Sequence, residues 1–417
     1  MTPRRFCFVT TFYPPYHFGG DGVFVYRLAE ALAARGHQVD VIHSIDAYRT
    51  KSDVEPTVAF TDHPNVRRIG LRSSHPRWSA LQVHQTGRPL PYVDQLEAHF
   101  AANHYDVIHY HNVSLMGAPA ILRMGSAVKF YTTHEYWLVC PTHVLFKNDR
   151  EACTSRSCFS CTLRSHRPPQ WWRATSQLAE SLAWVDAVLT PSRFARDRHA
   201  SDGIAKPLTL LPHFVPVPTD GELAVSTPAA RPYFLYVGRL ERLKGVQDLL
   251  EIFGEYRDAD LLIVGSGDSA ASLRAAAQSM PHVRFLDTVH PSAMGSYIRQ
   301  AIALLVPSLC YETFALSAAE AMAYGTPVIG RRLGAVQELL EISGGGLTFE
   351  SLTECRAAME RLRSEPDVRA AFGRAGRSFA QREWSIEVHL ARYEALVESH
   401  LELHRAQQAE MQAPRHP

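Results

Sequence analysis

Short apolar runs alternate with helical patterns twice along this 417-residue chain, and this alternation constrains the fold most. In the first half, strands are predicted at 4–10, 39–43, 107–110, 128–132, 187–189 and 208–211. In the second half, strands are predicted at 233–237, 260–264, 283–286, 302–306 and 327–330, and helices at 246–254, 269–278, 314–324 and 351–363. Such alternation indicates mostly parallel sheets that helices cover on both faces.

A proline-rich stretch at 215–232 interrupts the pattern and is interpreted as a linker. We therefore expect an N-terminal domain at 1–214, a C-terminal domain at 233–383, and a final helix with a polar tail at 384–417. The expected fold class is α/β, with two Rossmann-like domains. A ligand should bind in the cleft between them, at the carboxyl ends of the parallel strands.

Charge and hydropathy narrow the class of protein. The net charge of +1 does not favour a nucleic-acid partner. Neither a signal peptide nor a run of about 18 apolar residues is visible, so we expect a cytoplasmic protein. The first half is net basic. This is typical either of a surface that faces a phosphorylated or membrane-held acceptor, at the inner face of a membrane, or of simple drift in surface charge.

Two segments of the second half carry residues suited to a diphosphate. Arg239 and Lys244 follow the predicted strand 233–237 and Gly238, so they place two cations at its carboxyl end. Thr313 is predicted to cap a helix, which would leave the backbone N–H groups of residues 314–316 facing the ligand. Glu312 would precede that helix and Glu320 would lie on it, within reach of ribose hydroxyls.

These segments resemble the family-four retaining glycosyltransferases, also called glycosyl transferases group 1. Residues 306–330, VPSLCYETFALSAAEAMAYGTPVIG, are similar to that family's paired-glutamate signature, and residues 13–42, 238–245 and 334–338 are similar to its other elements. This chain departs from the family pattern at two positions. It has Ala315 where family members commonly have glycine, and His213 where they commonly have asparagine. The similarity extends from Tyr13 to about Gly346.

The resemblance implies a GT-B fold and transfer of a hexose from a nucleotide sugar (UDP-, GDP- or similar) without a catalytic metal. The acceptor would be a sugar, a lipid-linked sugar or a small molecule, in polysaccharide, glycolipid or other glycoconjugate synthesis. Arg239 and Lys244 would bind the diphosphate, Glu312 would lie by the sugar, and Glu320 by the ribose. The remaining donor contacts would come from Gly20, Thr313, Phe314, Ala315 and Leu316.

Two histidines of the first half are predicted to line the sugar site. His111 directly follows the strand 107–110, and His134 follows the strand 128–132. We expect them to position the sugar or stabilise charge, because the family has no settled protein base. His109 shares a face with His111, and a buried histidine satisfied by the backbone is an equal alternative for it.

Four cysteines, Cys140, Cys153, Cys158 and Cys161, are spaced as ligands of a structural zinc would be. The alternatives are two disulfides or four free thiols. A cytoplasmic location disfavours the disulfides but not the free thiols. The neighbouring segment 164–173 mixes cations with tryptophans, and is either a peripheral membrane contact or a packed loop.

Three other functions stay open on the sequence alone. Gly265 to Ala270 fits the G-x-G-x-x-A pattern of an NAD(P)-dependent oxidoreductase, with Asp287 as the ribose-binding acid, but it follows the second strand of its domain rather than the first. A GT-B sugar-nucleotide epimerase and a non-catalytic binding subunit would share the same fold.

Overall fold

The N-terminal half forms a parallel sheet in this computed structural model, which describes residues 2–56, 59–219, 231–286, 289 and 291–412. Within those residues the sheet has the order β3-β2-β1-β4-β5-β8-β9. Its strands are β1 (Arg5–Thr10), β2 (Gln38–Ser44), β3 (Val66–Leu71), β4 (Val107–Tyr110), β5 (Val128–Thr132), β8 (Ala187–Thr190) and β9 (Leu208–Leu210).

The C-terminal half repeats this arrangement, with the order β12-β11-β10-β13-β14-β15 among the described residues. Its parallel strands are β10 (Tyr233–Val237), β11 (Asp260–Val264), β12 (Val283–Leu286), β13 (Leu304–Val306), β14 (Val328–Arg331) and β15 (Gly346–Phe349). In each sheet the strand order reverses beside the first strand, so β1 and β4, and β10 and β13, flank the point where doubly wound sheets bind ligands.

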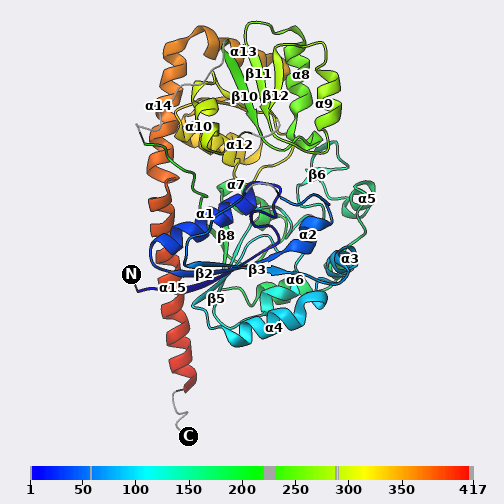
Figure 1. Ribbon diagram of the computed structural model, residues 1–417, viewed down its shortest axis with the longest axis vertical. Helices are drawn as coiled ribbons and strands as arrows, with labels where there is room; N and C mark the ends of the chain where they lie inside the picture. The colour runs from blue at the N-terminus through cyan, green and yellow to red at the C-terminus, as the bar shows by residue number, and fades with distance from the viewer. Residues whose placement is uncertain (1, 57–58, 220–230, 287–288, 290, 413–417) are drawn as a thin grey trace.

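Helices cover both sheets, as the two lobes in Figure 1 show. Those of the N-terminal lobe are α1 (Gly20–Ala34), α2 (Ile45–Arg49), α3 (Pro76–Thr86), α4 (Val93–Ala102), α5 (Cys158–Arg164), α6 (Gln177–Leu182) and α7 (Arg193–Ser201). Those that follow are α8 (Val246–Glu255), α9 (Ala270–Ala276), α10 (Pro291–Gln300), α11 (Leu316–Ala323), α12 (Gly334–Ser343), α13 (Leu352–Ser364), α14 (Pro366–Glu383) and α15 (Ile386–Gln412). A small hairpin joins β6 (Phe146–Lys147) to β7 (Glu151–Ala152).

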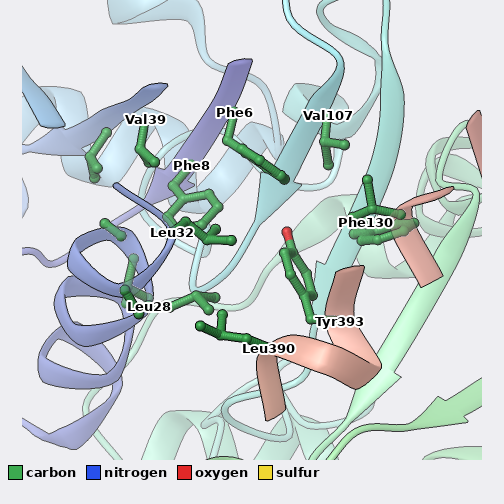
Figure 2. Packing of buried hydrophobic residues seen from close by; sticks show 14 of the residues in the cluster. Phe6, Phe8, Leu28, Leu32, Val39, Val107, Phe130, Leu390 and Tyr393 are labelled. Atoms are coloured by element: carbon green, nitrogen blue, oxygen red, sulfur yellow. The ribbon is translucent and has the colours of Figure 1, made fainter. Parts of the chain in front are cut away.

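The last helix, α15, returns to the N-terminal lobe (Figure 1). Its residues Leu390 and Tyr393 pack in one core with Phe6, Phe8 and Phe130 of the N-terminal sheet (Figure 2). The helix α14 instead contacts α11 of the C-terminal lobe. The fold is therefore α/β and GT-B, as expected, with a C-terminal helix that crosses from one lobe to the other.

Several elements differ from those predicted. The strands β3 and β15 and the helices α7, α10, α12 and α14 were not expected, and α11 begins at Leu316 rather than at residue 314. Of the expected linker, residues 220–230 lie outside the described residues, as do residues 413–417 of the expected tail.

Candidate functional site

The predicted donor residues meet at the carboxyl ends of β10 and β13, where the strand order of the second sheet reverses. Lys244 lies in a short 3-10 turn (Arg242–Lys244) that follows β10, and Glu312 follows β13. The ammonium of Lys244 donates to Oε1 of Glu312 at 2.6 Å, and the hydroxyl of Ser308 donates to the same oxygen at 2.7 Å. Residues predicted from separate motifs therefore form one charged cluster.

The environment keeps both partners of this ion pair charged. Burial opposes ionisation of Glu312, but Lys244 and Ser308 outweigh it and hold the pKa of the carboxyl below its ordinary value. Burial likewise acts against the charged form of Lys244, and attraction to Glu312 raises the pKa of the ammonium above its ordinary value. A buried pair of this kind is costly to break by removing one partner.

Arg239, the second predicted cation, is also paired. Its guanidinium donates to the carboxylate of Glu241 two residues on. Both cations expected to grip a diphosphate are thus neutralised by carboxylates in the protein alone. A dianionic ligand entering here would compete with Glu241 and Glu312 for them.

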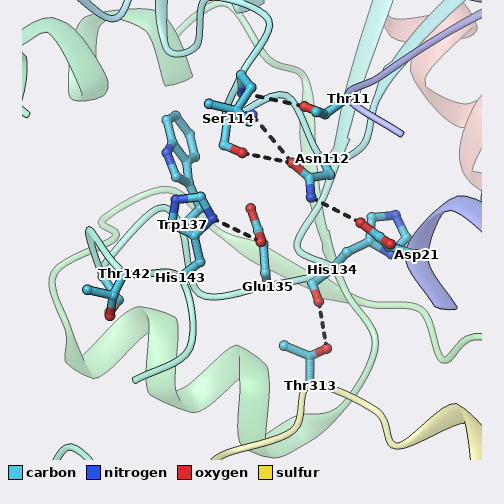
Figure 3. Close-up of polar contacts among 12 residues, drawn as sticks. Thr11, Asp21, Asn112, Ser114, His134, Glu135, Trp137, Thr142, His143 and Thr313 are labelled. Carbon is cyan, nitrogen blue, oxygen red and sulfur yellow. Dashed lines mark hydrogen bonds and ion pairs between the residues drawn. The ribbon is translucent and has the colours of Figure 1, made fainter. Parts of the chain in front are cut away.

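Thr313 does not cap the helix α11, and this prediction was wrong. Its hydroxyl donates across to the backbone carbonyl of His134 at 2.9 Å (Figure 3), so it is not available to the helix N-terminus. The N-cap is Ala315, whose φ of 50° and ψ of 63° are left-handed and which makes no side-chain cap. Phe314 is buried, and Ala315 and Leu316 are half-buried between the lobes.

Glu320 lies on α11 and forms an ion pair with the other lobe. Arg27 of α1 donates to Oε1 of Glu320 at 2.6 Å, and both side chains are partly exposed. Gly20, at the start of α1, approaches the same region so closely that a Cβ there would lie 2.9 Å from Cδ1 of Leu316. The first turn of α1 therefore faces the predicted donor residues.

His111 and His134 lie side by side in the N-terminal lobe. Their ring nitrogens Nδ1 and Nε2 are 2.9 Å apart, and Nε2 of His111 is buried without a partner. Burial lowers the pKa of His134 to about 4 and places that of His111 well below its ordinary value. Neutral rings at pH 7 can orient hydroxyl groups, and this favours a positioning role over charge stabilisation.

His109 differs from its neighbours because both of its ring nitrogens are used within the core. Nδ1 lies 3.0 Å from the hydroxyl of Tyr393, and Nε2 lies 2.8 Å from the hydroxyl of Thr132. The structure therefore favours a satisfied core histidine, but its partners are side-chain hydroxyls and not the backbone that the alternative named. His213, the departure from the family pattern, is buried and stacks on His134 with ring centroids 4.9 Å apart.

A carboxylate that the sequence analysis did not select lies beside His134. Glu135 accepts a hydrogen bond through Oε2 from Nδ1 of His143 at 3.1 Å, while its Oε1 is buried without a partner (Figure 3). Burial raises the pKa of Glu135, but His143, Arg167 and Lys51 outweigh it, so the carboxyl is ionised more readily than usual. The sequence feature that could have pointed to Glu135 is its position directly after His134, which was selected.

Lys51 is a second residue that sequence reasoning missed. Its ammonium lies 5.8 Å from the ring centroids of Phe12 and Phe18. Desolvation, followed by repulsion from Arg239 and Arg167, lowers the pKa of Lys51 below its ordinary value. These interactions place a cation of the N-terminal lobe near the predicted diphosphate residues.

The remaining predicted features are placed as follows. Gly265 and Gly267 follow β11, the second strand of the C-terminal lobe, and Asp287 lies outside the described residues. In the 164–173 segment, Trp172 is buried under Arg173 while Trp171 is exposed. No helix in the described chain is long and apolar enough to cross a membrane. Among the same residues, no group of three or more potential ligands is already arranged as a metal site.

Comparisons with known proteins identify the family. A model described as Glycosyltransferase Family 4 matches residues 18–219, and one described as Glycosyl transferases group 1 matches residues 231–365. The chain is 27% identical to the D-inositol 3-phosphate glycosyltransferase of Arthrobacter sp. (strain FB24), over 93% of this chain and 92% of that one. It is 25% identical to the MMP alpha-(1->4)-mannosyltransferase of Mycolicibacterium hassiacum, over 88% and 92% of the two chains.

Solved structures share the fold. Sucrose-phosphate synthase from Thermosynechococcus elongatus superposes with a TM-score of 0.70 at 22% identity, covering 98% of this chain and all of that one. Anabaena HepE in complex with UDP and glucose gives a TM-score of 0.66 at 16% identity, covering 95% of this chain and 100% of that one.

Proposed function

The chain belongs to glycosyltransferase family 4, the group 1 glycosyl transferases, and on this premise we propose that it moves a sugar from a nucleotide diphosphate sugar to an acceptor hydroxyl with retention of configuration. That the chain is a glycosyltransferase agrees with the names of its relatives. The donor class, the stereochemistry and the acceptor are the parts that we propose.

The charged cluster between β10 and β13 carries the donor assignment. The leaving diphosphate gains negative charge as the bond to the sugar breaks, and Arg239 and Lys244 would offset it without a metal ion. The donor would replace Glu312 as the partner of Lys244, which frees that carboxylate to contact the sugar. Glu320 would bind the ribose, and Gly20 with residues 313–316 would enclose the phosphates and sugar. The complex of HepE with UDP and glucose supports a nucleotide donor.

We propose a negatively charged acceptor that carries hydroxyl groups, such as a phosphorylated polyol or sugar. Lys51 and Arg167 contribute positive charge near the N-terminal side of the site. The relative named for D-inositol 3-phosphate supports this class of acceptor. Such acceptors, free or lipid-linked, are compatible with a cytoplasmic enzyme that contacts a membrane only peripherally.

Glu135 is the group that we assign to orient the acceptor hydroxyl, because its buried Oε1 has no partner. The change Glu135→Gln should lower kcat/KM for the acceptor by about ten- to a hundredfold, the worth of one hydrogen bond to a charged group. The thermal shift caused by the nucleotide should stay unchanged. Unaltered transfer, or a lost response to the nucleotide, would contradict this role.

The donor assignment is tested by a thermal-shift panel of UDP, GDP, ADP, dTDP and NAD. One nucleoside diphosphate at a hundredfold excess over its Kd should stabilise the protein by about 2.7 kcal/mol, and NAD should not. Lys244→Met should abolish this response, while Lys206→Met, a surface change on the other lobe, should keep it. Indifference to all four diphosphates, or a response to NAD alone, would overturn the assignment.

A further inference from the structure

The four cysteines of the 140–161 segment converge on one small cavity, although 21 positions separate the first from the last. Cys140, Cys153, Cys158 and Cys161 all line this cavity, whose volume is about 20 Å³. None of them is in a disulfide. Their convergence comes from three different local structures: a loop after β5, the end of the β6–β7 hairpin, and the helix α5.

Local backbone geometry holds the sulfur atoms in place. The N–H of Cys153 donates to the carbonyl of Leu145 at 2.7 Å, which closes the hairpin. The N–H of Asn148, in the hairpin turn, donates to Sγ of Cys161 at 3.3 Å. Cys158 and Cys161 are three residues apart on α5, so their side chains lie on one face of that helix.

The charge around the cavity suits an anionic centre. Lys147, Arg156 and Arg198 line it together with the four sulfurs, and Asp202 is the acidic residue of the lining. Asp202 already pairs with Arg198 at 2.8 Å and with Arg156 at 3.2 Å. Four thiolates around one divalent ion carry a net charge of −2, which these cations would offset.

We propose that these four thiolates bind one structural zinc ion, which anchors the segment between β5 and α6. The thiols are not yet gathered at ligand distances. A tetrahedral thiolate site has Zn–S distances of about 2.3 Å, so the four side chains would have to close around the ion. Each thiol would lose its proton on binding. The proposal does not rest on the donor assignment, and it needs no substrate to be tested.

Metal analysis of the purified full chain tests this site. We expect one zinc per chain, and cobalt substitution should give the strong visible bands of a tetrahedral thiolate site. The double change Cys158→Ser and Cys161→Ser should lose the metal and lower the melting temperature. Cys355→Ala, a change at a buried thiol of α13, should retain it.

The proposal is overturned by either of two results. One is a chain without metal whose mass is lower by four hydrogens, because two disulfides would then occupy the cavity. The other is a chain with all seven thiols reduced that takes up no zinc when incubated with excess zinc ions. Retention of zinc in the double serine variant would also contradict the assignment of the ligands.

Discussion

Ala315 has a backbone conformation that strongly favours glycine. Its φ of 50° and ψ of 63° place it in the left-handed region, immediately before α11. A Cβ atom there costs about 1–2 kcal/mol relative to a right-handed conformation. The family resemblance marks this position as one where glycine is common, so the chain retains the backbone shape without the residue that relaxes it.

We predict that Ala315→Gly stabilises the protein. The relief of strain exceeds the entropy that glycine adds to the unfolded chain, and we expect a net gain of about 0.5–1 kcal/mol in the free energy of unfolding. Differential scanning calorimetry should show a higher melting temperature. The matched control Ala319→Gly, inside α11, should lower the melting temperature by a similar energy. A lower melting temperature for Ala315→Gly would contradict the strain argument.

Residue identities in the donor cluster could be predicted from sequence, but their pairing could not. The motifs selected Lys244 and Glu312 because they follow predicted strands, and Glu320 because it is a charged residue on the apolar helix that comes next. The ion pair of Glu320 with Arg27 joins positions that are far apart in sequence, so no local spacing could indicate it. Glu135 directly follows the selected His134, but only the fold shows that one of its oxygens is buried without a partner.

At the scale of elements, α15 docks on the N-terminal lobe with one buried histidine, His389, in the contact. Nδ1 of His389 donates to the carbonyl of Pro212 at 2.7 Å, and its ring contacts Phe24 and Phe214. Burial lowers the pKa of His389 to about 4, against the opposing effect of the hydrogen bond to Pro212 and with repulsion from Arg392 acting in the same direction as burial. The docked helix therefore requires the neutral ring.

This contact predicts a loss of stability in acid. The folded pKa of His389 is about 4 and the unfolded one about 6.5, so the unfolded chain binds the proton first as the pH falls. Stability is fully present above pH 6.5, and about 2 kcal/mol from this residue should be lost by pH 5. Urea unfolding at pH 7.5 and 5.0 measures it. His389→Gln should weaken the pH dependence of the free energy of unfolding. The control His75→Gln, at an exposed position, should leave it unchanged. An equal pH dependence in the unaltered protein and both variants would contradict the role of His389.

Elements with continuous apolar runs were predictable, and those without them were not. The strands β1 and β10 are nearly all apolar, and both were found within a residue or two. The strand β3, VRRIGL, lies at a sheet edge and carries Arg67 and Arg68, so its pattern is broken. The strand β15 lies at the edge of the other sheet and is only half-buried.

At the scale of the whole molecule, polar contacts join the two lobes in addition to the apolar packing of α15. The hydroxyl of Tyr136 donates a hydrogen bond to the carbonyl of Glu312 at 3.1 Å. The carboxylate of Glu338, in α12, accepts a hydrogen bond from the backbone N–H of Phe194 at 2.6 Å. With the Thr313 and Arg27 contacts, these bonds surround the donor cluster. Binding of a donor would therefore alter groups that also set the relation between the lobes.

A crystal structure with the stabilising nucleoside diphosphate bound tests the central claim most directly. We predict its terminal phosphate within hydrogen-bonding distance of Lys244 and Arg239, and its ribose hydroxyls at Glu320 in place of Arg27. A nucleotide bound instead at the loop from Gly265 to Ala270, with the Lys244–Glu312 pair unchanged, would contradict the account.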